Sequence, residues 1–268
     1  MTRLAPLLGL AAWFSGAPAR AWVQATTREE PHRPLHVAGS NCLPMTLHAA
    51  GSDDVPFDDL RAAVEAGFGV WNDVPGAYIE FELTPVAACC RAEFLQQGAN
   101  ANCVRWREDE WPAEYPPNGI ALTTLTYAVE DGAILDADIE YNGVDFTFGT
   151  DCASGRVDIW NATAHEAGHA LGLDHSTAIG ATMRPRSYPG DCDLRDLTAD
   201  DAEGLAAIYP AAADPGTCLE PRGGLNLDCS PPPSADCDCR APGARPVPDG
   251  PAIALVTALA AARIRRRR

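Results

Sequence analysis

The sequence contains no lysine, so all 20 of its basic residues are arginines, and 37 acidic residues outnumber them. The resulting formal net charge of −17 argues against a nucleic acid as the binding partner. No apolar stretch reaches the ~20 residues that a membrane-spanning helix needs, and no internal repeat is present. These absences leave an acidic chain of 268 residues, which is long enough for one sizeable domain with extensions.

Cysteine is abundant by comparison, with 10 residues in the chain. This number is too high for a reduced cytosolic protein of this size, so we expect disulfides and an oxidising compartment. Six of the cysteines precede Pro210, which allows 15 sets of pairings among them, and the sequence does not choose between these. The cysteine content therefore predicts an exported protein.

The N-terminus also predicts export. Residues 1–21 contain Arg3, an apolar run over residues 4–14, and a small-x-small pattern at residues 19–21. This order is typical of a secretory signal peptide cut after Ala21, with a cut after Ala19 as the near alternative. A buried N-terminal helix is the other reading, but that helix would have no polar face. Residues 22–36 then form a short N-terminal segment.

The C-terminus differs in composition from the middle of the chain. Residues 211–250 are rich in Pro, Gly, Cys and Asp and predict a linker. Residues 251–268 predict a short apolar helix followed by an arginine cluster. Together with the Cys-Asp-Cys-Arg motif at residues 237–240, this order resembles the myxobacterial C-terminal surface-sorting tail. The resemblance implies processing during sorting, transient membrane contact, and a location outside the cell or at a bacterial cell surface. An exposed amphipathic tail is the alternative.

Residues 37–210 have the patterning of one folded domain. Five apolar residues repeat at spacings of three and four and predict an amphipathic helix: Phe57, Leu60, Val64, Phe68 and Trp71. Apolar or alternating runs predict four strands, at residues 78–83, 103–106, 120–128 and 134–142. Two further helices are predicted at residues 157–172 and 198–209, the second with a weak capping-box signal from Thr198 and Asp201.

The segment HEAGHALGLDH, residues 165–175, holds three of the six histidines of the chain. His165 and His169 are four residues apart, which places both imidazoles on one face of a helix, where they can bind one metal ion. Gly172 can adopt a positive φ at no steric cost, so the chain can turn there and bring His175 back as a third ligand. Three histidines leave the fourth position of a zinc ion open for water, which is the arrangement of a catalytic site.

Glu166 gives this motif a catalytic interpretation. Zinc lowers the pKa of bound water to ~7 and polarises a bound carbonyl group, while Glu166 is placed to take the proton of the water. Ordinary surface or core histidines are the alternative, but agreement at five fixed residues in eleven is not expected by chance.

The full pattern resembles the metzincin metalloproteases and, more narrowly, their matrixin branch. Ser176 follows the third histidine, and residues 181–185 (ATMRP) resemble the Met-turn, with Met183 beneath the zinc. For Met183, plain core packing is the alternative. The resemblance covers residues 40–210. It implies an α+β fold, with a twisted, mostly parallel sheet, an antiparallel edge strand and three helices. It also implies a zinc-dependent endopeptidase that acts on peptides or proteins.

The resemblance further indicates where substrate binds. By their order along the chain, residues 120–128 are the antiparallel edge strand, to which an extended peptide adds as a further strand. The expected substrate-binding residues are Ile120, Ala121, Leu122, Thr123, Pro185 and Tyr188. Tyr188 lies five residues after Met183, whereas the family's pocket tyrosine lies four after. The sequence also lacks the family's Pro-Arg-Cys-Gly latency segment and its loop for a second zinc, so the means of latency is left open.

Two other features carry less weight. The sequence Asn161-Ala162-Thr163 matches a glycosylation site but lies in a predicted helix, so we interpret it as a chance match. Four aspartates are candidates for Ca2+, although solvated turn residues are the commoner reading and their spacing fits no EF-hand: Asp136, Asp138, Asp145 and Asp151. We expect a monomeric endopeptidase. The alternatives are a non-catalytic metal-binding or adhesion protein, which would not need Glu166, and a zinc hydrolase of a non-peptide substrate.

Overall fold

The computed structural model describes residues 20–84 and 90–225, and the backbone alone of residues 253–261. Nearly all of the predicted signal peptide falls outside the described residues, as do Cys89, the Cys-Asp-Cys-Arg motif at residues 237–240 and the terminal arginine cluster. Within the described part of the chain, no helix is long and apolar enough to cross a membrane.

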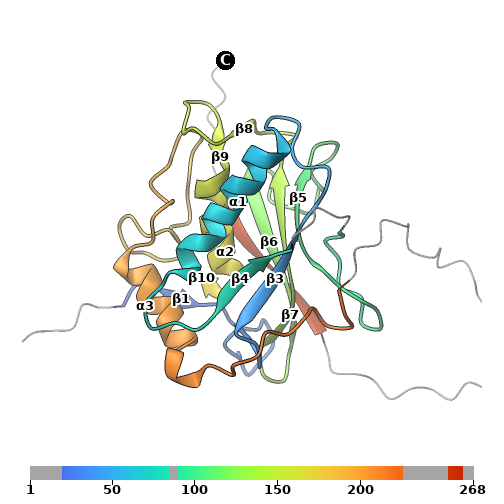
Figure 1. The fold of residues 1–268 in the computed structure, drawn as a ribbon, viewed down its shortest axis with the longest axis vertical. Helices are drawn as coiled ribbons and strands as arrows, with labels where there is room; N and C mark the ends of the chain where they lie inside the picture. The colour runs from blue at the N-terminus through green and yellow to red at the C-terminus, as the bar shows by residue number, and fades with distance from the viewer. Residues whose placement is uncertain (1–19, 85–89, 226–252, 262–268) are drawn as a thin grey trace, which may run out of the picture.

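A seven-stranded sheet forms the centre of the molecule (Figure 1). Six of its strands follow one another in this order: β11 (Ile253–Ala261), β6 (Gly119–Ala128), β7 (Ala133–Asn142), β5 (Asn102–Arg107), β3 (Cys42–Leu47) and β4 (Glu80–Leu83). The seventh strand, β2 (His36–Val37), pairs with β7 outside this order. All pairs among β2, β3, β4, β5 and β7 are parallel, whereas β6 pairs antiparallel with both β7 and β11. This mostly parallel sheet with antiparallel strands at one side confirms the predicted α+β class.

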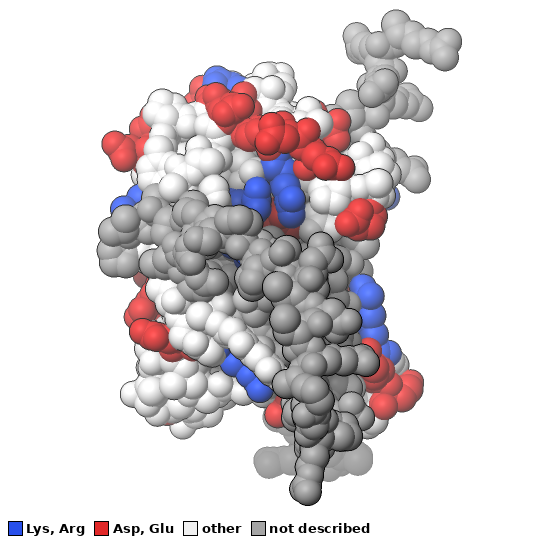
Figure 2. Space-filling view, turned by 90° about the vertical axis from the view of Figure 1, so that its right-hand side faces the viewer, with Lys and Arg blue, Asp and Glu red and all other residues white. Residues whose placement is uncertain are grey.

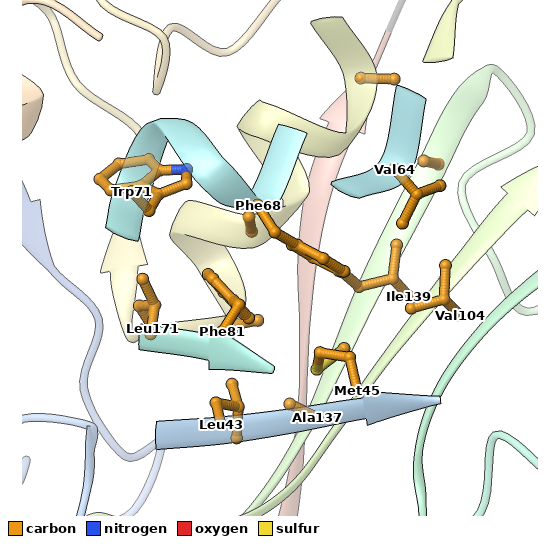
Figure 3. Close-up of a cluster of buried hydrophobic side chains, with 14 of the residues drawn as sticks. Leu43, Met45, Val64, Phe68, Trp71, Phe81, Val104, Ala137, Ile139 and Leu171 are labelled. Atoms are coloured by element: carbon orange, nitrogen blue, oxygen red, sulfur yellow. The ribbon is translucent and has the colours of Figure 1, made fainter. Parts of the chain in front are cut away.

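Helices α1 (Phe57–Asn72) and α2 (Ile159–Ala170) pack together in front of the sheet in the view of Figure 1. Because side chains alternate along a strand, Ala137 and Ile139 of β7 both point into the core, where they meet side chains from α1 and β3 (Figure 3). The two helices approach closely at Gly67, where a Cβ would lie 2.5 Å from the Cβ of Thr163. This packing fixes α2, which carries the histidine motif.

The remaining elements are short, apart from α3 (Ala199–Ile208). They are β1 (Val23–Gln24), β8 (Phe148–Gly149), β9 (Val157–Asp158), β10 (Leu173–Asp174) and the 3-10 helix η1 (Ala211–Ala213). Helix α3 begins with the predicted capping box, in which the Asp201 carboxylate accepts a hydrogen bond from the backbone N–H of Thr198 at 2.9 Å.

The helices and strands predicted between residues 57 and 209 are present, with differences at their ends. Residues 157–158 form β9 instead of a first helical turn, because the Asp158 side chain accepts from the N–H of Asn161 and caps α2. The sequence does not predict β3, whose residues are buried on both faces and therefore do not alternate. Residues 253–261 form strand β11 where the sequence predicts a short helix. The β-branched Ile253, Val256 and Thr257 favour the extended form.

Three disulfides join described residues, in agreement with the expected oxidising compartment: Cys42–Cys218, Cys90–Cys103 and Cys152–Cys192. The first of them joins β3 to a residue that follows Pro210. Part of the predicted linker is thus held covalently against the domain, while the boundary at residue 210 stays a prediction.

Charged side chains gather at the surface, where acidic ones follow the upper rim of one face and basic ones lie below them (Figure 2). Two acidic side chains are instead fully buried and pair with arginine at 2.5 Å, Glu140 with Arg107 and Asp158 with Arg195. A buried carboxylate without a partner is strongly destabilising, so these arginines keep two interior charges compatible with the fold.

Candidate metal centre

The histidine motif lies on α2 and on the turn that follows it. His165 and His169 are one turn apart on the helix, and both are buried. The helix ends at Ala170, and two residues later Gly172 has a φ of +87°; a Cβ there would lie 2.6 Å from the carbonyl oxygen of Leu35. Only glycine fits both the conformation and the space, so the chain turns at this residue as predicted and returns His175 toward the helix.

The three imidazoles face one another. Their ring centroids are 4.8 Å apart for His165 and His169, 4.9 Å for His169 and His175, and 5.4 Å for His165 and His175. One ring nitrogen from each lies within 4.8 Å of the other two. All three Nε2 atoms are buried and have no hydrogen-bond partner among the described residues. Three converging nitrogen lone pairs without a donor fit a metal cation.

The other ring nitrogens fix the orientation of two of these rings. Nδ1 of His165 lies 2.7 Å from the carbonyl oxygen of Thr182, and Nδ1 of His169 lies 2.8 Å from that of Leu173. A carbonyl oxygen only accepts, so Nδ1 carries the proton in both rings. The lone pair of each neutral ring is then on Nε2, which points to the shared centre.

Burial also favours the neutral form of the three histidines. Desolvation lowers the pKa of His165 to about 4, and it lowers the pKa of His169 well below the ordinary value. Burial lowers the pKa of His175 as well, against the attraction of Asp174. Neutral imidazole is the form that binds metal ions, so the fold presents the site ready for a cation at neutral pH.

Met183 packs against the helix that carries His165 and His169. It is buried, and its sulfur occupies the space beside Gly168 of α2, where a Cβ would lie only 2.2 Å from it. The turn that contains Met183 is held by the buried carboxylate of Asp201. This carboxylate accepts hydrogen bonds from the backbone N–H of Thr182 at 2.9 Å and from that of Met183 at 3.0 Å. The carbonyl of Thr182 in turn orients His165. The α3 capping residue therefore also positions the metal site, a role that the sequence pattern does not reveal.

Glu166 is buried beside the histidines and is held by β6. The hydroxyl of Thr123 donates to its Oε2 at 2.6 Å and also lies 3.1 Å from its backbone oxygen. Burial raises the pKa of Glu166 to about 7, and the hydrogen bonds from Thr123 oppose that rise. A carboxylate with a pKa near neutrality is well suited to accept and return a proton.

A small apolar hollow adjoins His165 and Glu166. Of the expected substrate-binding residues, Ile120 lines it. Thr123 contacts Glu166. Ala121 and Leu122 lie between Ile120 and Thr123 on β6. The hollow is also lined by four residues that the sequence does not indicate as substrate-binding: Arg184, Arg186, Ser187 and Leu194.

Pro185 and Tyr188 are exposed and are not part of this lining. Their substrate-binding roles stay predictions. The neighbouring turn instead places Ser187 at the hollow, where its hydroxyl lies 3.1 Å from the Asn161 amide. Asn161 is itself buried and also accepts the backbone N–H of Leu194 at 2.7 Å. These contacts agree with the interpretation of its glycosylation motif as a chance match.

The four candidate Ca2+ ligands do not come together within the described chain as a group able to hold one ion. Asp136 and Asp138 are buried residues of strand β7, whereas Asp151 pairs with Arg156 at 2.8 Å. Asp145 receives a hydrogen bond from Asn142 at 3.1 Å. Calcium binding stays a prediction.

The chain was compared with known proteins. Residues 45–210, more than half of the chain, match the family model described as Matrixin. The chain is 30% identical over 170 residues to an interstitial collagenase of Bos taurus, covering 63% of this chain and 32% of that protein. It is 31% identical over 147 residues to a neutrophil collagenase of Homo sapiens, covering 53% and 29%. It is also 26% identical over 167 residues to matrix metalloproteinase-C of Caenorhabditis elegans, covering 60% and 27%. The chain thus spans about a third of the length of these relatives.

Proposed function

Because the chain belongs to the matrixin family of zinc-dependent metalloproteases, we propose that it is an exported endopeptidase that cleaves extended peptides at the histidine centre. The observation that carries the proposal is the convergence of three histidine nitrogens that have no partner on the described chain, with the buried carboxylate of Glu166 lining the same hollow as His165. A structural metal site uses all four positions for protein ligands, whereas this one supplies three.

The roles of the residues follow from these contacts. His165, His169 and His175 would hold the zinc ion. When bound, zinc polarises the scissile carbonyl and lowers the pKa of water. Glu166 accepts a proton from the attacking water and delivers it to the nitrogen of the leaving amine. Met183 touches no substrate and supports the histidine-bearing helix.

The substrate in this proposal is a peptide or protein in extended form. Strand β6 contacts the carboxylate of Glu166 through Thr123, and β6 lies between β7 and β11 instead of at the edge that the sequence predicts. When β11 is not paired with it, β6 would be the outer strand, and backbone groups along an outer strand can pair with an added strand. Ile120, Ala121, Leu122 and Thr123 would thus align the peptide through main-chain contacts. The hollow beside Ile120 would take one of its side chains.

Export is supported by the three disulfides of the described chain. The signal peptide, the surface-sorting tail and its transient membrane contact stay predictions, as does the monomeric state. The proposal includes no nucleic-acid partner, because the chain is strongly acidic.

The first prediction tests Glu166. The purified, zinc-loaded chain should cleave members of a random peptide library, read by mass spectrometry, and a chelator should stop the cleavage. Glu166→Gln keeps the shape of the side chain but cannot accept the proton, so kcat should fall by about 10²–10⁴ while zinc content is retained.

Glu203→Gln is the matched control, because it makes the same change at an exposed position of α3 and should leave kcat as in the parent. Equal rates for the parent and Glu166→Gln would contradict the assigned mechanism. A zinc-loaded chain that leaves the whole library intact, with its C-terminal segment attached or released, would contradict the endopeptidase.

A further inference from the structure

Strand β6 is paired along both of its edges. On its inner side it pairs with β7, and on its outer side it pairs antiparallel with β11, from Ile253 opposite Ala128 to Ala260 opposite Ala121. Figure 1 shows β11 in red at this side of the sheet. The outer edge of a sheet presents a row of unpaired N–H and C=O groups that readily accept another strand. Here a segment of the same chain takes that place.

The paired stretch includes the point where β6 meets the candidate centre. Thr123, whose hydroxyl donates to Glu166 at 2.6 Å, lies opposite Ala258. Leu122 lies opposite Leu259, and Thr124 lies opposite Thr257. The β11 backbone therefore occupies the stretch of β6 along which a peptide would have to lie to bring its scissile bond to Glu166.

The composition of this segment suits strand addition. Its sequence, IALVTALAA, contains no charged residue, no proline and no glycine. Such segments pair readily with an exposed strand edge. A tether in the same chain also raises the local concentration of the segment to the order of millimolar, so an external peptide must compete with it.

We propose that residues 253–261 form an intramolecular blocking strand, which occupies the substrate edge of β6 and weakens substrate binding until the C-terminal segment is released. The proposal rests on the proposed function. It gives the tail a regulatory role in a sequence that lacks the family's Pro-Arg-Cys-Gly latency segment. The occupant of the edge is an extended, uncharged segment of small and apolar residues of this chain.

The test begins with the full chain, so that folding is unchanged. A recognition sequence for a site-specific protease is inserted after Gly243, which follows Cys239, the last cysteine of the chain, so no disulfide retains the released piece. Cutting and removal of the piece should lower KM for a library-derived peptide by about tenfold or more, with kcat unchanged, because the competing strand is lost. The uncut insertion variant is the control. A synthetic IALVTALAA peptide added to the cut enzyme should inhibit it competitively.

A second variant disrupts the pairing without cutting. Adjacent backbone N–H groups of a strand point in opposite directions, so Thr257→Pro with Ala258→Pro removes at least one N–H that faces β6. This variant should have the lowered KM of the cut enzyme. The matched control is the exchange Thr257→Ala with Ala258→Thr, which keeps the composition and both N–H groups and should resemble the parent.

Amide hydrogen exchange of β6 gives a readout that needs no activity. Amides of residues 119–128 should exchange faster once the tail is removed, because their outer partners leave. Unchanged exchange in β6, or an unchanged KM in an enzyme that cleaves the library, overturns the blocking strand and leaves the proposed function standing. Faster exchange in β6 without cleavage in either form supports the pairing and overturns the proposed function instead.

Discussion

Two buried clusters of titratable side chains lie on opposite faces of the sheet, and the comparison between them shows what makes one a candidate site. The histidine cluster lies on the face covered by α2. Asp136 and Asp138 of β7 lie on the other face, because they alternate with Ala137 and Ile139 of the core. All of these aspartate and histidine side chains, apart from the half-buried His175, are removed from water.

The two aspartates can share one proton. Burial raises the pKa of Asp136 to about 7, and burial together with repulsion from Asp136 raises the pKa of Asp138 well above its usual range. One carboxyl can then donate to the other, and Asp138 also accepts the backbone N–H of Cys103 at 2.8 Å. Two carboxyls that share one proton need no cation to offset two charges, although Oδ1 of Asp136 has no hydrogen-bond partner among the described residues.

The histidine cluster has no such internal solution. Nδ1 of two of the rings already donates to a carbonyl, so their Nε2 atoms present lone pairs, and all three Nε2 atoms converge. A proton placed on one ring can reach at most one other nitrogen and leaves the third without a donor. Burial alone therefore does not identify a site. The distinguishing feature is a set of acceptors that only a cation can satisfy together.

The largest effect is expected when the histidine cluster is broken. His169→Ala removes one of three ligands, and two histidines cannot hold zinc tightly, so the variant should lose most of the approximately one zinc per chain expected of the parent. Metal analysis of the dialysed proteins gives the answer. His32→Ala, at an exposed histidine, is the control and should keep its zinc. Zinc retained in full by His169→Ala would show that the cluster is not the metal site.

A smaller effect is expected at Thr123, the β6 residue whose hydroxyl contacts the Glu166 carboxylate. Thr123→Val keeps the shape but removes the hydroxyl that donates to Oε2. A hydrogen bond to a charged group contributes about 1.5–3 kcal/mol, so kcat should fall roughly tenfold to a hundredfold, with KM and zinc content little changed. Thr123→Ser keeps the hydroxyl and should restore most of the rate. A KM increase shared by both variants would indicate a packing role instead.

The contrast between the two clusters also explains how far the sequence predicts the site. The spacing of the histidines and Gly172 is local, so helical geometry alone predicts the convergence that the structure shows. The three predicted helices depend on equally local apolar spacings and capping residues. Strand β3, by contrast, is buried on both faces and has no periodicity to recognise.

The contacts that support the site join residues far apart in the chain, and local patterns do not predict those. Thr123 and Glu166 are 43 residues apart, and Thr182 and Asp201 are 19 apart. The pairing of β11 with β6 is similarly non-local, and it converts a predicted helix into a strand because an open sheet edge offers partners for its backbone. Sequence reasoning therefore predicts the metal ligands better than it predicts the residues that position them.

The smallest effect is expected at the aspartate pair, through the dependence of stability on pH. Because the pKa of Asp136 is raised in the folded chain, that chain binds more protons than the unfolded chain between pH about 4 and about 7, so the free energy of unfolding falls as the pH rises through this window. Asp136→Asn replaces the titrating group with a permanent donor to Asp138. The variant should match the parent near pH 5 and exceed it at pH 8 by about 1–3 kcal/mol, since about 1.36 kcal/mol is lost per pH unit across the window, or roughly 2–10 °C in the thermal midpoint. Asp73→Asn, at an exposed position after α1, should follow the parent at both pH values. A gap between Asp136→Asn and the parent that is constant with pH would mean that the pair does not share a proton, and the comparison with the histidine cluster would lose its basis.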